Sequence, residues 1–259
     1  MVKILTLMIK RIAFILILTL ALSIAGAAQS TSTFTYRASR VLMDSTWDKN
    51  NEPVVEGIIG FHKPELDRLM QQVIGISEQE MRSGRPESLL SNFAADAMLI
   101  YGRDFSNREV DFSLTNFGGL RATLPKGEVK RYDIFSIFPF ENYVVILELP
   151  GSSVRTLFES FASNRVEAFS HNVQLEIKDG MLKDVLIDGQ QVDITKNYRV
   201  VTIDFLMSGG DNVTALRDAT DIEYTGKLLR DVMIERIEKL TASGKKISSS
   251  ITRRVIIED

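Results

Sequence analysis

Two Asp-Gly turns in one stretch are the feature that most constrains how this chain folds. The segment NVQLEIKDGMLKDVLIDGQQVD alternates apolar and polar residues around Asp179-Gly180 and continues to Asp188-Gly189. An Asp-Gly pair between two such runs is typical of a two-residue hairpin turn, in which both residues take a positive φ. The segment therefore predicts antiparallel strands joined by tight turns.

Helical and strand patterns alternate along the rest of the chain. Helices are predicted over residues 63–72, 87–101 and 151–162 and over LLRDVMIERIEKL. Strands are predicted for VDFSLT, YVVILELP and NYRVVTIDFL, and the segment TRRVIIED closes the chain. Because helices and hairpins are mixed, we expect an α+β fold: a single domain with a mixed β-sheet and packed helices. This domain is expected over residues 55–259, after a polar N-terminal arm at 29–54.

The first 28 residues differ from the rest. Three basic residues precede the uncharged stretch IAFILILTLALSIAGAA, which ends in small residues. This layout predicts a secretory signal peptide cleaved near Ala27 or Ala28, and hence export to a periplasm or to the outside of the cell. An uncleaved membrane anchor is the alternative, since the apolar stretch is just long enough to span a bilayer. After cleavage we expect no stable membrane insertion.

Charge and cysteine content exclude several classes of function. Removing residues 1–28 changes the formal net charge from −3 to −6, because that segment holds three basic and no acidic residues. An acidic protein lacks the positive surface potential that attracts the phosphate backbone of DNA or RNA. The sequence contains no cysteine. Disulfides, thiolate metal sites and cysteine nucleophiles are therefore excluded.

Residues for self-sufficient catalysis are scarce. The two histidines, His62 and His171, are far apart in the sequence, and neither lies at metal-ligand spacing to a second ligand. A catalytic zinc site needs about three protein ligands, and a two-metal site needs more. No Gly-x-Ser-x-Gly, Ser-x-x-Lys or phosphate-binding glycine motif is present. A carboxylate pair drawn from Asp96, Asp204 and Asp211 stays open. We expect no cofactor in this chain.

Three stretches at strand ends carry binding chemistry: NFGGLR, FPFEN and DFLMSGGDN. Two phenylalanines can sandwich a flat heteroaromatic ring, an amide can read its edge, and a carboxylate can accept ribose hydroxyls. An arginine can hold an anionic group. Each stretch alone has a structural explanation as a turn or as part of the core. Together they favour a ligand site where strand ends meet.

Four segments in order resemble one known family. ESLLSNFAADAM, LTNFGGLRATLPKGEV, DIFSIFPFENYVVILELPG and IDFLMSGGDNVTAL are similar to the C-terminal domain of the 5'-nucleotidase family, over about residues 55–257. In that family this domain holds the nucleoside or nucleotide, and a preceding metallophosphatase domain performs the hydrolysis. The resemblance implies a nucleoside or nucleotide ligand here, with divalent metals only in a partner metallophosphatase.

The resemblance implies nine substrate-binding residues: Arg85, Asn116, Gly118, Gly119, Arg121, Phe140, Asn142, Phe205 and Asp211. Asn116 and Arg121 resemble loop residues that contact the sugar and the phosphate side. Arg85 resembles a further arginine of the family, at an offset position.

The other implied roles concern the base and the ribose. Phe140 and Phe205 resemble the two aromatic plates around the base. Asn142 resembles a contact to the edge of the base, and Asp211 an acceptor for the ribose hydroxyls.

The chain departs from the family pattern in three ways. Phe117 replaces the first glycine of the usual Asn-Gly-Gly-Gly, which narrows the loop. His171 lies near a position where some relatives have a glycine close to the ligand. Only the leader and a short arm precede the domain in this sequence, where the family has its catalytic domain.

Three functions remain open. The first is an exported substrate-binding subunit of a split 5'-nucleotidase, working in nucleotide catabolism with a separate metallophosphatase. The second is a binding-only protein that captures nucleosides or nucleotides. The third is a stand-alone hydrolase with an unrecognised site, which the shortage of metal ligands disfavours.

Overall fold

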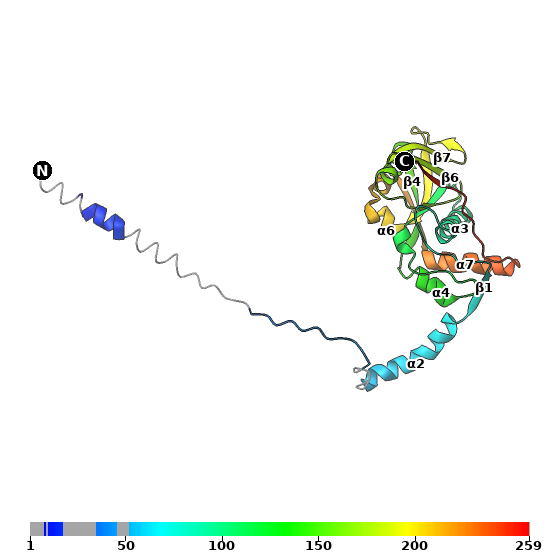
Figure 1. Ribbon diagram of the computed structural model, residues 1–259, viewed down its shortest axis with the longest axis horizontal. Helices are drawn as coiled ribbons and strands as arrows, with labels where there is room; N and C mark the ends of the chain where they lie inside the picture. Colours follow the sequence, from blue (N-terminus) through cyan, green and yellow to red (C-terminus); the bar gives the residue numbers. More distant parts are fainter. Residues whose placement is uncertain (1–7, 9, 18–34, 46–51, 259) are drawn as a thin grey trace. The chain divides into compact units, whose positions relative to one another are not determined.

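A computed structural model describes residues 8, 10–17, 35–45 and 52–258 (Figure 1). Residues Gly57–Asp259 form one compact unit, and Met1–Glu56, which include the first turn of helix α2 (Pro53–Met70), belong to a second unit. Most of the predicted signal peptide (1–28), with its cleavage position, lies outside the described residues. Among the described helices, none is both long and apolar enough to cross a membrane.

The compact unit mixes helices and strands in one α+β fold, as predicted. Its α-helices and 3₁₀ turns are α2 (Pro53–Met70), α3 (Leu89–Phe105), η1 (Phe117–Gly119), α4 (Arg131–Ile137), α5 (Gly151–Ser163), α6 (Asp204–Met207), η2 (Gly210–Asn212), η3 (Thr214–Asp218) and α7 (Leu229–Ala242). Its strands are β1 (Val73–Ser77), β2 (Phe112–Thr115), β3 (Gly127–Lys130), β4 (Tyr143–Pro150), β5 (Ala168–Phe169), β6 (Val173–Lys178), β7 (Met181–Ile187), β8 (Gln190–Gln191), β9 (Asn197–Ile203), β10 (Asp221–Leu228) and β11 (Val255–Glu258).

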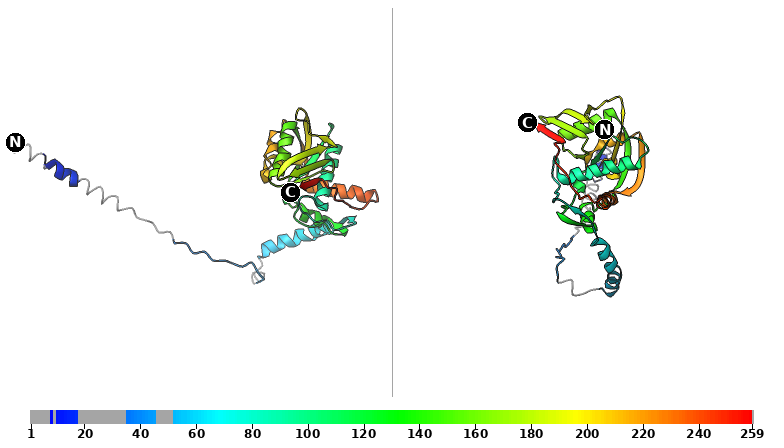
Figure 2. Two further views of the ribbon diagram at one scale, coloured as in Figure 1. Left: turned by 45° about the horizontal axis from the view of Figure 1, so that its top comes forward. Right: turned by 90° about the vertical axis from the view of Figure 1, so that its right-hand side faces the viewer.

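The central sheet is mixed and has the strand order β10-β4-β9-β2-β5. β2 runs parallel to β9, whereas β4 runs antiparallel to β9. The centre of this sheet is buried on both faces, with Val144–Leu147 and Val200–Ile203 inaccessible to solvent and all apolar except Thr202. α3 covers one face through contacts with β2, β5 and β9 (Figure 2). The centre of the sheet therefore lies in the core.

The predicted hairpins are confirmed in a second sheet, of order β11-β6-β7-β8. Asp179 and Gly180 have φ values of 49° and 71°, and Asp188 and Gly189 have 51° and 75°. Both turns thus have the two positive φ values that a tight Asp-Gly turn requires. In Figure 1 this hairpin lies at the opposite end of the domain from α4 and α7.

Some element boundaries differ from prediction. The helix predicted at 63–72 begins at Pro53 and continues through Pro64, and none of its residues is buried. Proline removes one backbone donor, which favours a helix start at that position, but the apolar residues before it extend the helix. The strand NYRVVTIDFL ends at Ile203, because Asp204 Oδ1 accepts hydrogen bonds from the N–H groups of Tyr143 and Phe205 and begins α6.

Candidate functional site

The three sequence motifs meet at one end of the central sheet. β2 and β9 are parallel neighbours, so Asn116 and Phe205 follow strands that end at the same edge. β4 is antiparallel to β9 with Val144 opposite Ile203, so FPFEN enters the sheet at that edge. The topology thus confirms the predicted gathering of these strand ends.

The loop after β2 is a turn of 3₁₀ helix held by Asn116. Asn116 is 4 % exposed, and its Nδ2 donates to Asp211 Oδ2 at 2.6 Å. A Cβ atom on Gly119 would lie 2.7 Å from Asn116 Oδ1, and one on Gly118 would lie 3.4 Å from Asp211 Oδ2. The glycine pair therefore lets the loop approach the Asn116–Asp211 contact closely.

The second glycine pair, Gly209-Gly210, precedes Asp211, which is the acceptor in the contact with Asn116. Gly209 has a φ of 86°, and an added Cβ would collide with the Arg217 guanidinium. A Cβ on Gly210 would lie 2.4 Å from the Phe205 ring. Asp211 itself has a φ of 51°, a left-handed conformation that is unusual outside glycine. These constraints fix Asp211 opposite Asn116.

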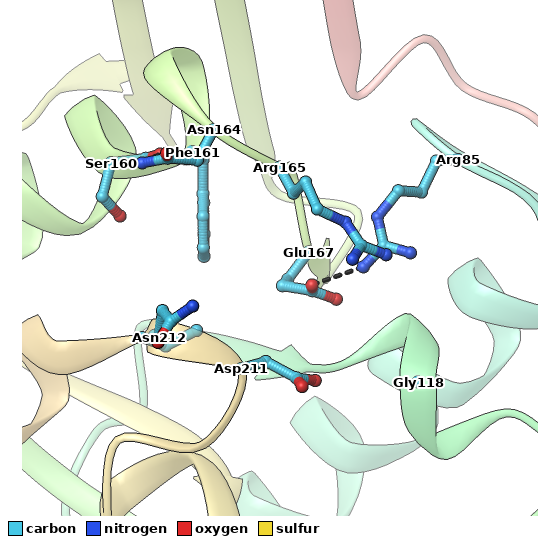
Figure 3. Close-up of a pocket in the computed structure, with 10 residues that line it drawn as sticks. Arg85, Gly118, Ser160, Phe161, Asn164, Arg165, Glu167, Asp211 and Asn212 are labelled. Atoms are coloured by element: carbon cyan, nitrogen blue, oxygen red, sulfur yellow. Dashed lines mark hydrogen bonds and ion pairs between the residues drawn. The ribbon is translucent and has the colours of Figure 1, made fainter.

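A pocket of about 720 Å³ lies beside this contact (Figure 3). Its lining residues come from the two glycine loops, the end of α5, the segment before β5 and the segment before α3: Arg85, Gly118, Ser160, Phe161, Asn164, Arg165, Glu167, Asp211, Asn212 and Val213. The volume suits a small organic ligand. Its walls carry two guanidinium groups and two carboxylates.

Glu167 is the most buried charged group of this pocket, at 3 % exposed. Its Oε2 accepts the backbone N–H of Phe117 at 2.7 Å, and its Oε1 pairs with the Arg85 guanidinium. Burial raises the pKa of the Glu167 carboxyl, and the Asp211 charge adds to the rise; Phe117 N–H and Arg85 act in the opposite direction. The carboxylate is thus held by an anion-binding pair of donors.

The two arginines of the pocket differ in their contacts. Arg85 stacks over the Phe117 ring, with 4.6 Å from its Cζ to the ring centroid, and its Nε donates to the Val166 carbonyl at 3.0 Å. Arg165 is exposed and, within the described part of the chain, makes no ion pair. Both side chains point toward Glu167 in Figure 3. Phe117, the departure from the glycine pattern, therefore supports Arg85.

The structure brings only some of the nine predicted residues to this pocket. Arg85, Gly118 and Asp211 line it, and Asn116 and Gly119 are buried behind its wall. Four others share the sheet end but do not line the pocket: Arg121, Phe140, Asn142 and Phe205. Their roles as ligand contacts stay predictions.

The two predicted aromatic plates are not core residues. Phe140 is 48 % exposed and Phe205 is 43 % exposed, whereas Phe138, two residues before Phe140, is 3 % exposed. The fold thus leaves about half of each ring, Phe140 and Phe205, exposed to solvent. Both rings are therefore accessible to a ligand, and their role as plates around a base stays a prediction.

Sequence reasoning missed one wall of the pocket. Ser160, Phe161, Asn164, Arg165 and Glu167 lie at the end of α5 and in the link to β5. No motif marks SFASNRVEAF, because these residues reach the glycine loops only through long-range packing. The one signal in the sequence that could have indicated this wall is the pair of charged residues, Arg165 and Glu167, directly before the apolar strand β5.

The three candidate carboxylates do not pair with each other. Asp96 bridges His171 and the buried Arg254, with 3.2 Å from Asp96 Oδ1 to His171 Nδ1 and 2.7 Å from Oδ2 to Arg254 Nη2. Asp204 accepts backbone N–H groups, and Asp211 accepts from Asn116. Asp96 therefore ties the C-terminal segment to α3. In the described residues, no group of three or more His, Cys, Asp or Glu side chains is placed to hold a metal ion.

Comparison with known proteins agrees with this architecture. The family model described as "5'-nucleotidase, C-terminal domain" matches residues 71–218, which is more than half of the chain. A trifunctional nucleotide phosphoesterase protein of Bacillus subtilis is 26 % identical over 213 residues, covering 74 % of this chain and 14 % of its own length. Protein UshA of Escherichia coli is 28 % identical over 145 residues, covering 54 % of this chain and 26 % of its own.

Solved structures show the same fold. A 5'-nucleotidase precursor from Thermus thermophilus superposes with a TM-score of 0.68 at 24 % identity, over 79 % of this chain and 43 % of that one. The NAD nucleotidase of Haemophilus influenzae superposes with a TM-score of 0.62 at 20 % identity, over 80 % and 41 %. This chain thus spans less than half the length of these relatives.

Proposed function

Because the chain belongs to the family of 5'-nucleotidase C-terminal domains, we propose that it binds a nucleoside or nucleotide at this end of its central sheet. The observation that carries the proposal is that the segments bearing the half-exposed Phe140 and Phe205 lie at the same end of the sheet as the Asn116–Asp211 contact. The base would lie between Phe140 and Phe205, with Asn142 at its edge. The ribose hydroxyls would meet Asp211, and the rest of the ligand would enter the pocket beside it.

The hydrolytic step belongs, in this proposal, to a separate metallophosphatase. The support is the sequence's shortage of metal ligands, since its two histidines are far apart. The chain is then the substrate-binding subunit of a split 5'-nucleotidase acting in nucleotide catabolism. Residues 55–259 would be the binding domain, and the arm at 29–54 would connect it to the leader.

Export is part of the same proposal. The support is the layout of residues 1–28, with basic residues before an apolar stretch that ends in small residues. The mature protein would then act in a periplasm or outside the cell. Mass spectrometry of the protein recovered from its native host tests this directly. A mature N-terminus near residue 28 is expected, and an intact residue 1 contradicts it.

The purified chain is expected not to hydrolyse adenosine monophosphate (AMP) when Mg²⁺, Mn²⁺ or Zn²⁺ is added. A metallophosphatase needs a set of ligands that two separated histidines do not supply. Phosphate release is measured with and without the partner metallophosphatase, which is expected to restore turnover. Metal-stimulated release by this chain alone, at constant specific activity through purification, contradicts the proposal and supports a stand-alone hydrolase.

Asp211→Asn is expected to weaken adenosine and AMP binding alike. The change removes the negative charge that ribose hydroxyls would donate to, but leaves an oxygen that still accepts from Asn116. Losing a charge-assisted hydrogen bond costs about 1.5–3 kcal/mol, and calorimetry measures the difference. A 2',3'-dideoxynucleoside lacks the hydroxyls and should bind both proteins equally. An equal loss for the dideoxy ligand contradicts the role given to Asp211.

A second function, capture of a nucleoside without hydrolysis, is favoured by one observation. The buried Glu167 carboxylate already neutralises Arg85 in the pocket. A ligand that carries no phosphate fits such a pocket better than one that does.

A further inference from the structure

Glu167 is buried in a pocket wall, where a carboxylate is costly unless donors compensate it. Two donors do so. One is the Phe117 backbone N–H, at 2.7 Å from Oε2, and the other is the Arg85 guanidinium, which pairs with Oε1. A backbone N–H of a glycine-containing loop beside a guanidinium is an arrangement that binds phosphate and carboxylate groups. In this protein, the anion at that position is a side chain of the protein itself.

The other charged groups of the pocket also disfavour a bound phosphate. The Asp211 carboxylate lines the same pocket, and its charge contributes to the raised pKa of Glu167. The positive groups are Arg85, which Glu167 engages, and Arg165, which is exposed to solvent. A phosphate that entered would therefore meet two carboxylates, with only a solvent-screened guanidinium unengaged.

We propose that Glu167 is a specificity-determining residue: its carboxylate occupies the anion position formed by Phe117 N–H and Arg85, and so weakens the binding of a nucleotide's phosphate there. The pocket then takes the uncharged nucleoside in preference. The identity of the ligand rests on the proposed function, whereas the occupied anion position does not. Because the position is built from donors on two segments, removing the carboxylate leaves them free to bind an external anion.

Inorganic phosphate is the probe that tests the anion position alone. Titration of the purified chain by calorimetry is expected to show weak binding, and Glu167→Ala is expected to bind phosphate at least about tenfold more tightly. That change is what one charge-assisted contact to a guanidinium produces. Glu128→Ala is the control, because it removes one carboxylate from the exposed strand β3, away from the pocket lining. It should leave phosphate binding unchanged.

Glu167→Gln covers the case in which the alanine variant does not fold. It keeps an oxygen acceptor for Phe117 N–H but removes the charge, so a smaller gain in phosphate affinity is expected. If every folded Glu167 variant binds phosphate no more tightly than the wild type, the proposal is overturned.

Adenosine and AMP separate the inference from the proposed function. The wild type is expected to bind adenosine more tightly than AMP, and Glu167→Ala is expected to reverse that order. If the wild type prefers AMP and the variants keep the same ratio, the inference falls while the proposed function stands. If neither ligand binds but the phosphate gain appears, the anion position stands and the nucleoside assignment falls with the proposed function.

Discussion

Gly119→Val is expected to abolish detectable binding of adenosine and AMP alike. A Cβ at this position would lie 2.7 Å from Asn116 Oδ1, and valine adds two methyl groups to that Cβ. Because Asn116 is buried, we expect the clash to displace its side chain from the hydrogen bond to Asp211. Overpacking of this kind also costs about 1–3 kcal/mol of stability. Both ligands lose affinity because the change acts on the wall they share.

Gly57→Val is the matched control, because no atom lies within 4 Å of a Cβ at that position on the exposed helix α2. It should leave ligand binding unchanged. Circular dichroism and thermal melting establish that the Gly119 variant is folded before calorimetry is interpreted. If a folded Gly119→Val protein binds adenosine as the wild type does, NFGGLR is only a turn and has no role in ligand binding.

Phe140→Ala and Phe205→Ala are each expected to weaken adenosine binding by about 1–3 kcal/mol, or about 5- to 150-fold in Kd. Each ring would supply one face of the stack on the base. Both rings are about half exposed, so removing them should leave the melting temperature nearly unchanged. Calorimetry with adenosine measures the affinities.

Two control variants show what the loss of an exposed ring and the loss of a core ring each produce. Tyr224→Ala removes a ring that is 67 % exposed on β10 and should not affect binding. Phe158→Ala removes a fully buried ring and should cost about 3–5 kcal/mol of stability. If Phe140→Ala and Phe205→Ala instead destabilise the fold as Phe158→Ala does, both are core residues and the proposed stacking on the base is wrong.

The fold was largely predictable because its signals are local. The Asp-Gly turns need two positive φ values, and few residue pairs other than Asp-Gly or Asn-Gly provide them. YVVILELP begins and ends as β4 because its apolar run is bounded by Asn142 and Gly151. The start of α2 at Pro53 was missed, since proline reads equally well as the first turn of a helix and as its interruption.

The site was predictable only where motifs mark it. The glycine loops indicate close backbone approach, and the structure brings both to the Asn116–Asp211 contact. Glu167 carries no such mark, because its role arises from the packing of the α5–β5 link against the loop after β2. Propensity and periodicity do not encode contacts between segments 50 residues apart.

Nucleotide presentation and nucleoside capture make opposite demands on the pocket. A subunit that presents a nucleotide to a metallophosphatase has to admit its phosphate, whereas a nucleoside-capturing protein does not. The Arg85–Glu167 ion pair affects this difference directly, because Glu167 occupies the guanidinium that a phosphate would otherwise bind. A wild type that prefers adenosine would favour capture, or binding of the hydrolysis product.

The central claim is that this chain binds a nucleoside-type ligand at the end of its central sheet. Calorimetric titration of the purified chain with adenosine, AMP and a sugar nucleotide tests it most directly, with Phe205→Ala titrated in parallel. We predict saturable binding of adenosine with one site per chain, weakened in the variant. No binding of any of the three ligands, or binding that Phe205→Ala leaves unchanged, would contradict the claim.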